Sequence, residues 1–169
     1  MRQRKLLKGL LLLVFMSWNT IGAKAMASKE QDSIARVLDQ FHEAASEHDF
    51  SSYFGLMSSD AVFIGTDASE RWDLAAFRAY VKPHFDQGRG WTYKAKERHI
   101  TLAKGGSFAW FDEILENAKY GTCRGTGVLV KSGKDWKISQ YHLTIPVPNG
   151  LAETLVKLIK DQEKSPVKK

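Results

Sequence analysis

The second half of the sequence contains four segments rich in β-branched and aromatic residues, and this series constrains the fold more than any other feature. The segments are residues 91–102, 108–117, 120–131 and 135–147. The connections between them are short and contain Gly105-Gly106, Ala118-Lys119 and Ser132-Gly133. Connections of this length join neighbouring antiparallel strands as hairpins. The sequence therefore predicts an antiparallel meander.

The first of these segments changes its apolar phase part of the way along. Its apolar residues fall at odd positions up to Ala95 and then at Ile100 and Leu102. A change of phase within a strand indicates a β-bulge, which bends the strand. We therefore expect a curved sheet.

Helical periodicity dominates the first half and the C-terminal end. Apolar residues recur at three- and four-residue spacing in two long segments and in a last helix that begins near Asn149. A short helix over residues 50–57 and a short buried strand over residues 61–64 are expected between the first two. Asp67 and Glu70 have the spacing of a capping box and are expected to start the second long helix. The apolar stripes are Ile34, Val37, Leu38, Phe41 and Ala45; Leu74, Phe77, Val81 and Phe85; and Leu151, Leu155, Leu158 and Ile159.

Helices followed by a long meander describe an α+β domain. We expect a curved antiparallel sheet wrapped by N-terminal helices around a pocket, followed by a C-terminal helix. The run Phe108-Ala109-Trp110-Phe111 is apolar on both faces of its strand. A sheet that is apolar on both faces needs a second cover, so a homodimer through the outer face is expected.

The N-terminus has the three parts of a secretory signal peptide. Basic residues within 1–5 precede an apolar run at 10–16 and the small-residue pattern Ala23-Lys24-Ala25. The apolar run is shorter than the roughly 20 residues that span a bilayer. We therefore expect a signal peptide over residues 1–25, one domain over residues 26–169 with a short basic C-terminal tail, and an exported protein that is periplasmic or secreted without a membrane anchor.

Charge and cysteine content narrow the function classes further. The chain has 25 Lys and Arg against 19 Asp and Glu, but five of the basic residues and none of the acidic ones lie in residues 1–25. The remaining chain is almost neutral, which argues against nucleic-acid binding. Cys123 is the single cysteine, so no disulfide forms within the chain, and we expect it to be a small buried residue.

The hairpin turns predict which side chains share a face of the sheet. A two-residue turn at Ala118-Lys119 places Asp112 opposite Gly125, and a turn at Ser132-Gly133 places Gly125 opposite Gln140. In this register Asp112 and His142 lie on one face, with glycines between them that leave room for a ligand. We expect Asp112 and His142 to be the catalytic pair, because a buried carboxylate and a histidine suit acid–base chemistry. The expected ligand-binding residues are Trp110, Gln140, Phe63 and Tyr93.

A three-residue connection near Ala118 would exchange the two faces of the strand after the turn relative to the strand before it. Glu113 would then join the pocket residues in place of Asp112, since a shift of one residue moves every side chain to the other face. In the two-residue register, Glu113, Arg124 and Tyr141 form a cross-strand polar cluster or part of a dimer surface.

Other motifs that would indicate chemistry are missing. Gly125-Thr126-Gly127 leads into a strand and lacks the strand-to-helix context of a dinucleotide site. The five histidines lack metal-ligand spacing, and no nucleophile elbow occurs. No metal and no cofactor is expected.

Several segments resemble the SnoaL-like domain of the nuclear transport factor 2-like superfamily. They are residues 61–67, 109–113, 125–129 and 136–142, and the likeness covers about Asp32 to Pro148. The resemblance implies a cone-shaped α+β barrel with a deep hydrophobic cavity that often dimerises through its sheet. Relatives include ketosteroid isomerases, polyketide cyclases and dehydratases, as well as non-catalytic members. Where the isomerases carry their base in the first strand, this chain has Phe63-Ile64-Gly65.

Two functions from different classes follow. The first is an exported domain that binds a small apolar ligand and carries out cofactor-independent acid–base chemistry on a carbonyl compound. The second is a non-catalytic interaction and dimerisation module whose cavity is filled by its own aromatic side chains.

Overall fold

The computed structural model describes residues 26–164. The predicted signal peptide, residues 1–25, and the end of the basic tail, residues 165–169, lie outside the described residues. A long N-terminal helix covers residues 26–46. The elements that follow are α2 (Phe50–Gly55), β1 (Met57–Ile64), β2 (Arg71–Asp73), α3 (Leu74–Asp86), β3 (Lys94–Leu102), β4 (Phe108–Asn117), β5 (Gly121–Ser132), β6 (Asp135–Thr144), the 3-10 helix η1 (Asn149–Leu151) and α4 (Ala152–Lys164).

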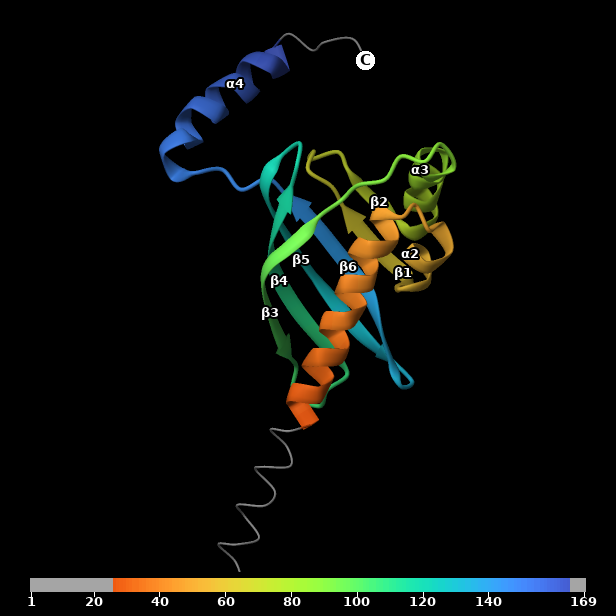
Figure 1. Ribbon diagram of the computed structural model, residues 1–169. Coiled ribbons are helices and arrows are strands. Elements are labelled where there is room, and N and C mark those ends of the chain that lie inside the picture. Colours follow the sequence, from red (N-terminus) through yellow and green to blue (C-terminus); the bar gives the residue numbers. More distant parts are fainter. Residues whose placement is uncertain (1–25, 165–169) are drawn as a thin grey trace, which may run out of the picture.

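The strands form one curved sheet in the order β2-β1-β6-β5-β4-β3. The N-terminal helix crosses one face of the sheet, and α2 and α3 lie at the end of that face near β1 (Figure 1). This arrangement confirms the expected α+β cone. The meander β3 to β6 is antiparallel as predicted, but β1 runs parallel to β6, so the sheet is mixed.

The predicted bulge in the first strand of the meander is confirmed. The pairing of β3 with β4 shifts between Ala95 and Glu97. A second irregularity lies in the pairing of β5 with β6, between Val128 and Leu129. Because bulges increase the local bend, both contribute to the curvature of the sheet.

The interior of the cone is packed with apolar and aromatic side chains. Ile34, Leu38 and Phe41 of the N-terminal helix are buried, as the periodicity predicted. Phe63 of β1 stacks on Phe77 of α3 with ring centroids 4.0 Å apart. Burial of one such side chain contributes about 1.5–3 kcal/mol relative to leaving it exposed. Packing of this face therefore holds the helices on the sheet.

The β4–β5 turn corrects the predicted register. Asn117 pairs with Gly121, so three residues form the connection instead of two. The Asn117 side-chain oxygen accepts hydrogen bonds from the backbone N–H groups of Lys119 and Tyr120, both at 2.9 Å. Asn favours such turns because its side chain can replace a backbone acceptor. The two-residue prediction was wrong, and the three-residue alternative holds, so Glu113 faces the helices and Asp112 faces outward.

The β5–β6 turn also differs from its prediction. Ser132 pairs with Asp135, and the irregularity farther along the strands brings Gly127 opposite Tyr141. Tyr141 is therefore buried and Gln140 is exposed. The bulge is visible in the sequence of β6, where the apolar phase moves from Trp136 and Ile138 to Tyr141.

Two predicted helix starts are also corrected. Asp67 and Glu70 do not start a helix; they belong to the turn between β1 and β2, where the N–H of Asp67 donates to the Glu70 carboxylate. Asp73 is the cap of α3 and accepts from the N–H of Ala76 at 2.8 Å. Asn149 lies at the start of the 3-10 helix η1, before α4.

Helix α4 projects from one end of the molecule (Figure 1). No residue of α4 is buried, and its apolar stripe is exposed. Leu151, Leu155, Leu158 and Ile159, which the sequence placed on one helical face, therefore have no cover within residues 26–164.

Gly125 provides a test of the corrected register. A Cβ atom at this position would lie 2.2 Å from the Tyr141 hydroxyl and 2.9 Å from Glu113 Oε1. We expect Gly125→Ala to reduce the free energy of unfolding by about 1–3 kcal/mol, as overpacking of a core does. Gly55→Ala is the control, because a Cβ atom there meets nothing within 4 Å. Urea unfolding measures both, and an unchanged midpoint for Gly125→Ala would refute this register.

Candidate functional site

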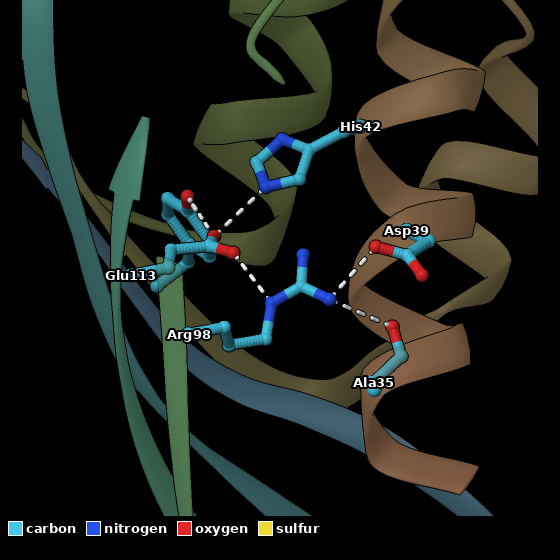
Figure 2. Close-up of polar contacts among 6 residues, drawn as sticks. Ala35, Asp39, His42, Arg98 and Glu113 are labelled. Atoms are coloured by element: carbon cyan, nitrogen blue, oxygen red, sulfur yellow. Dashed lines mark hydrogen bonds and ion pairs between the residues drawn. The ribbon is translucent and has the colours of Figure 1, made fainter. Parts of the chain in front are cut away.

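Glu113 is a fully buried carboxylate on the inner face of β4. Its Oε1 accepts hydrogen bonds from His42 Nε2 at 2.8 Å and from the Tyr141 hydroxyl at 2.9 Å. Its Oε2 accepts from Arg98 Nε at 2.8 Å. A buried carboxylate requires such partners, since an unpaired charge in the interior is very costly. Figure 2 shows His42 and Arg98 on either side of this one carboxylate.

Arg98 connects the cluster to the N-terminal helix. Its Nη1 donates to the backbone carbonyl of Ala35 at 3.1 Å and to Asp39 Oδ1 at 2.7 Å (Figure 2). One guanidinium therefore joins β3, β4 and the helix. The sheet and the helix are held together by charge as well as by apolar packing.

The electrostatics of the cluster favour the ionised carboxylate. Burial raises the pKa of Glu113, but the hydrogen bonds and charges of His42 and Arg98 outweigh this effect and hold the pKa below its ordinary value of 4.5. Burial lowers the pKa of Arg98, but Glu113 and Asp39 more than offset it. Burial and the charge of Glu113 raise the pKa of Tyr141 well above its ordinary value, so its hydroxyl stays a neutral donor.

His42 lies at the edge of this buried cluster. Its side chain keeps 10% of its surface exposed. Its ring lies 6.4 Å from the ring of Tyr93, between centroids. The ring nitrogen that does not contact Glu113 points away from the carboxylate (Figure 2). The His42 and Arg98 side chains, 10% and 11% exposed, are therefore nearly covered, while Glu113 is fully buried.

Two buried side-chain polar atoms in the described part of the chain have no hydrogen-bond partner. They are the Tyr53 hydroxyl and Arg98 Nη2. Burial raises the pKa of Tyr53 well above its ordinary value, and the Trp91 side chain nearby offsets part of this without completing a hydrogen bond. An unsatisfied buried polar group costs about 1–3 kcal/mol. Both atoms lie in the buried interior of the cone.

An open cleft of about 1070 Å³ lies next to the cluster at the end of the cone from which α4 emerges. It is bounded by the C-terminal half of α3, residues 89–94 and the β4–β5 hairpin at residues 116–122, and we call it the mouth cleft. Tyr93 lines the mouth cleft and contacts His42, and Trp91 lines it above Tyr53. One layer of aromatic side chains therefore separates the mouth cleft from the polar interior.

The structure brings Asp112 and His142 to one face, but that face is not the concave one. Both pair with Thr126, from opposite sides, on the outer face of the sheet. Asp112 is exposed and His142 is half-buried. The prediction that the two line an internal pocket was wrong, because the register is shifted by one residue. Their catalytic role stays a prediction.

The predicted ligand-binding residues are divided among three places. Tyr93 lines the mouth cleft. Phe63 is buried in the aromatic core, and Trp110 and Gln140 are exposed on the outer face. Burial raises the pKa of Tyr93 to about 12, so this hydroxyl is a donor in the neutral range. Cys123 is buried in β5, as expected.

Sequence reasoning missed His42 and Arg98. His42 had a usable signal, because position 42 follows Leu38 by four residues and so lies on the buried stripe of its helix. A polar residue on that stripe needs a partner from the sheet. Arg98 follows the bulge of β3, and its direction could not be assigned without the exact position of that bulge.

The described residues contain no group of three or more metal-ligating side chains that could hold an ion. The helices within residues 26–164 also lack the combined length and apolar character needed to cross a membrane.

The fold and the buried cluster define a class: an α+β cone with a polar group inside and a cleft at its mouth. Solved structures share this architecture, including a nuclear transport factor 2-like protein of unknown function from Pseudomonas putida KT2440. It is 13% identical, with a TM-score of 0.58, and the match covers 75% of this chain and 90% of that one.

Two further similar structures carry provisional enzyme names. One, provisionally a ketosteroid isomerase from Shewanella frigidimarina, is 20% identical with a TM-score of 0.52, covering 64% of this chain and 92% of that one. The other, provisionally a dehydratase from Streptomyces avermitilis, is 11% identical with a TM-score of 0.58. This match covers 69% of this chain and 96% of that one. At these identities the likeness shows the fold alone.

The family follows from the sequence itself. The SnoaL-like domain family matches residues 34–148. This protein therefore belongs to the SnoaL-like domain family. No curated protein matches the chain.

Because Glu113 has a low pKa in the folded protein, we expect acid to reduce the stability of the fold. Its pKa is lower in the folded than in the unfolded protein, so its stabilisation is complete above about pH 4.5 and is lost as the pH falls below that value. At pH 7 we expect Glu113→Gln to reduce the free energy of unfolding by about 3–5 kcal/mol, because Arg98 loses its buried counter-charge. The variant should also lose less stability than wild type between pH 6 and about pH 3.

Glu116→Gln is the matched control. Glu116 lies on the same strand and pairs with Lys96, but both side chains are exposed. This variant should keep the stability and the acid profile of wild type. Denaturant unfolding across pH measures all three proteins. If Glu113→Gln and Glu116→Gln behaved alike, Glu113 would not be the anchor described here.

Proposed function

We propose that this domain binds a small organic molecule at the mouth cleft and that His42 is the acid–base group that acts on it. The observation that carries this proposal is the 2.8 Å contact between His42 Nε2 and Glu113 Oε1. The proposal keeps the class of function expected from the sequence, cofactor-independent chemistry on a carbonyl compound, and moves it from Asp112 and His142 to His42.

The contact determines the tautomer of His42. An ionised carboxylate can only accept hydrogen bonds, so Nε2 carries the proton that it donates to Glu113. In the neutral imidazole, Nδ1 is then unprotonated and can accept a proton from a bound molecule. A carboxylate that orients a histidine in this way is a recurrent device of general-base catalysis.

A nearby donor supports a carbonyl ligand. Tyr93 lines the mouth cleft, and its ring contacts the ring of His42. A hydroxyl donor beside a base stabilises the oxyanion that forms when a proton is removed next to a carbonyl group. The provisional isomerase and dehydratase names of two similar structures are consistent with proton-transfer chemistry.

A second function, a non-catalytic interaction module, is favoured by two observations. The interior of the cone is filled by its own aromatic side chains, including the stacked pair Phe63 and Phe77. The apolar stripe of α4 is exposed. In this alternative the buried cluster is purely structural, and the mouth cleft has no small ligand.

His42→Gln separates the two functions. The Gln side-chain amide can still donate to Glu113, but it cannot accept a proton. We expect the variant to bind ligands within about threefold of wild type and to lose turnover by about 10²- to 10⁴-fold, the range for loss of a general acid or base. A panel of aromatic and aliphatic ketones and enones, followed by nuclear magnetic resonance for turnover and by tryptophan fluorescence for binding, supplies the measurement.

His99→Gln is the control, because His99 makes a 2.8 Å contact with Glu97 on the exposed side of β3. Asp112→Asn is measured alongside it. Loss of turnover in Asp112→Asn with none in His42→Gln would return the catalytic role to Asp112. Absence of both binding and turnover across the panel in wild type would favour the interaction module.

We also propose that the chain forms a homodimer through the outer face of the sheet. Phe108 and Trp110 lie two residues apart on β4, and 44% and 47% of their surfaces are exposed. Trp110 pairs with Val128 of β5, so the apolar surface extends across strands. Exposed aromatic residues of this kind mark the centres of protein interfaces.

Sedimentation velocity tests the dimer. At about 10 µM we expect wild type to sediment as a dimer and Trp110→Glu as a folded monomer, because the variant places a charge at the centre of an apolar interface. Tyr120→Glu, a change at an aromatic residue of the mouth cleft, should remain dimeric. A monomeric wild type, or a dimeric Trp110→Glu, would argue against this interface.

We also propose that the chain is exported, because its leader sequence has the three parts of a signal peptide. N-terminal sequencing of the exported protein tests this, and a first residue at or near Met26 is expected.

A further inference from the structure

The walls of the mouth cleft are aromatic. Trp91 and Tyr93 contribute from the segment after α3, Tyr80 from α3, and Tyr120 from the β4–β5 hairpin. Tyr80 and Tyr120 have 44% and 46% of their surfaces exposed. In Figure 1 the segment after α3 crosses the molecule from α3 to β3. Such walls favour a flat, unsaturated molecule.

The same cleft carries an excess of positive charge. Arg89, Lys94 and Lys119 line it, together with one carboxylate, Glu116. Glu116 is already paired with Lys96, which lies outside the lining. None of the three lining cations makes an ion pair with a carboxylate in the part of the chain that the structure describes.

The positive charge of the mouth cleft contrasts with the near-neutral charge of the chain outside the leader. Outside the leader the sequence is almost neutral, with 20 basic and 19 acidic residues once the five basic residues before Met26 are removed from the totals of 25 and 19. Some basic side chains, such as Lys82 and Lys131, have an acidic partner, whereas others, such as Lys104, have none among the described residues. What distinguishes the mouth cleft is that three cations without an acidic partner gather beside aromatic side chains, where a negative group can bind at little desolvation cost.

We propose that the mouth cleft binds an anionic aromatic molecule, with the ring against Trp91, Tyr93 and Tyr120 and the carboxylate or similar acid group held by Arg89 and Lys119. This rests on the proposed function, small-molecule binding at the same cleft, and narrows its ligand to a charged class. Arg89 can form a bidentate contact with a carboxylate, whereas Lys119 supplies a point charge beside the Tyr120 ring, 4.9 Å from its centroid.

Two probes of nearly the same shape, one charged and one neutral, test whether a negative charge strengthens ligand binding. 2-Naphthoate and 2-naphthamide differ in charge and little in size, and calorimetry reports on their binding. At low ionic strength we expect wild type to bind 2-naphthoate about tenfold more tightly than 2-naphthamide, with the difference shrinking as salt is added.

Substitutions of the lining cations show which side chains bind the negative group. Arg89→Gln and Lys119→Gln should each weaken 2-naphthoate binding about three- to tenfold and leave 2-naphthamide binding unchanged. Lys134→Gln, at the exposed β5–β6 turn on the opposite end of the strands, should change neither. Melting temperatures of all three variants should match wild type, since these side chains are exposed.

The outcomes separate this proposal from the one on which it rests. Equal affinities for the two probes in wild type would overturn the anionic class and leave small-molecule binding in place. Stronger 2-naphthoate binding that Arg89→Gln and Lys119→Gln do not weaken would also overturn it, because the anion would then bind elsewhere. Binding of neither probe would overturn both proposals.

Discussion

The ion pair between Arg98 and Glu113 is the interaction on which the rest of this structure depends. Glu113 is inside the cone, where an unpaired carboxylate would be too costly, and three donors from three elements converge on it. Arg98 then reaches the N-terminal helix through the Ala35 carbonyl and Asp39. Aromatic packing could hold the helix against the sheet in several rotations, but these directed contacts select one. The position of His42 behind Tyr93, which lines the mouth cleft, is a consequence.

The same constraint explains the two glycines of β5. A side chain at Gly125 would occupy the place of the Tyr141 hydroxyl, and one at Gly127 would meet the backbone of Gln140 and the ring of Phe111. From the sequence, these glycines were expected to leave room for a ligand. In the structure that space is filled by Tyr141 and Phe111, so the cone is closed inside and a ligand has access only at its mouth.

Much of the fold could be predicted, because periodicity is a strong signal. The meander, the bulge in β3 and the buried stripe of the N-terminal helix follow from the alternation of apolar residues. The site could not be predicted in the same way, since one residue in a turn decides which face a carboxylate occupies. Asn117, whose side chain accepts two backbone N–H groups, was the available evidence for the longer turn. The parallel pairing of β1 with β6 has no local signal, because about seventy residues separate the two strands.

The central claim is that an ionised, buried Glu113 fixes the tautomer of His42. Nitrogen-15 magnetic resonance of the histidine rings, at a pH where the His42 imidazole is neutral, measures this directly. We expect the proton of His42 to reside on Nε2 in wild type, with Nδ1 unprotonated, and this preference to weaken in Glu113→Gln. A proton on Nδ1 in the wild-type protein would contradict the account, because Nε2 could not then donate to Glu113.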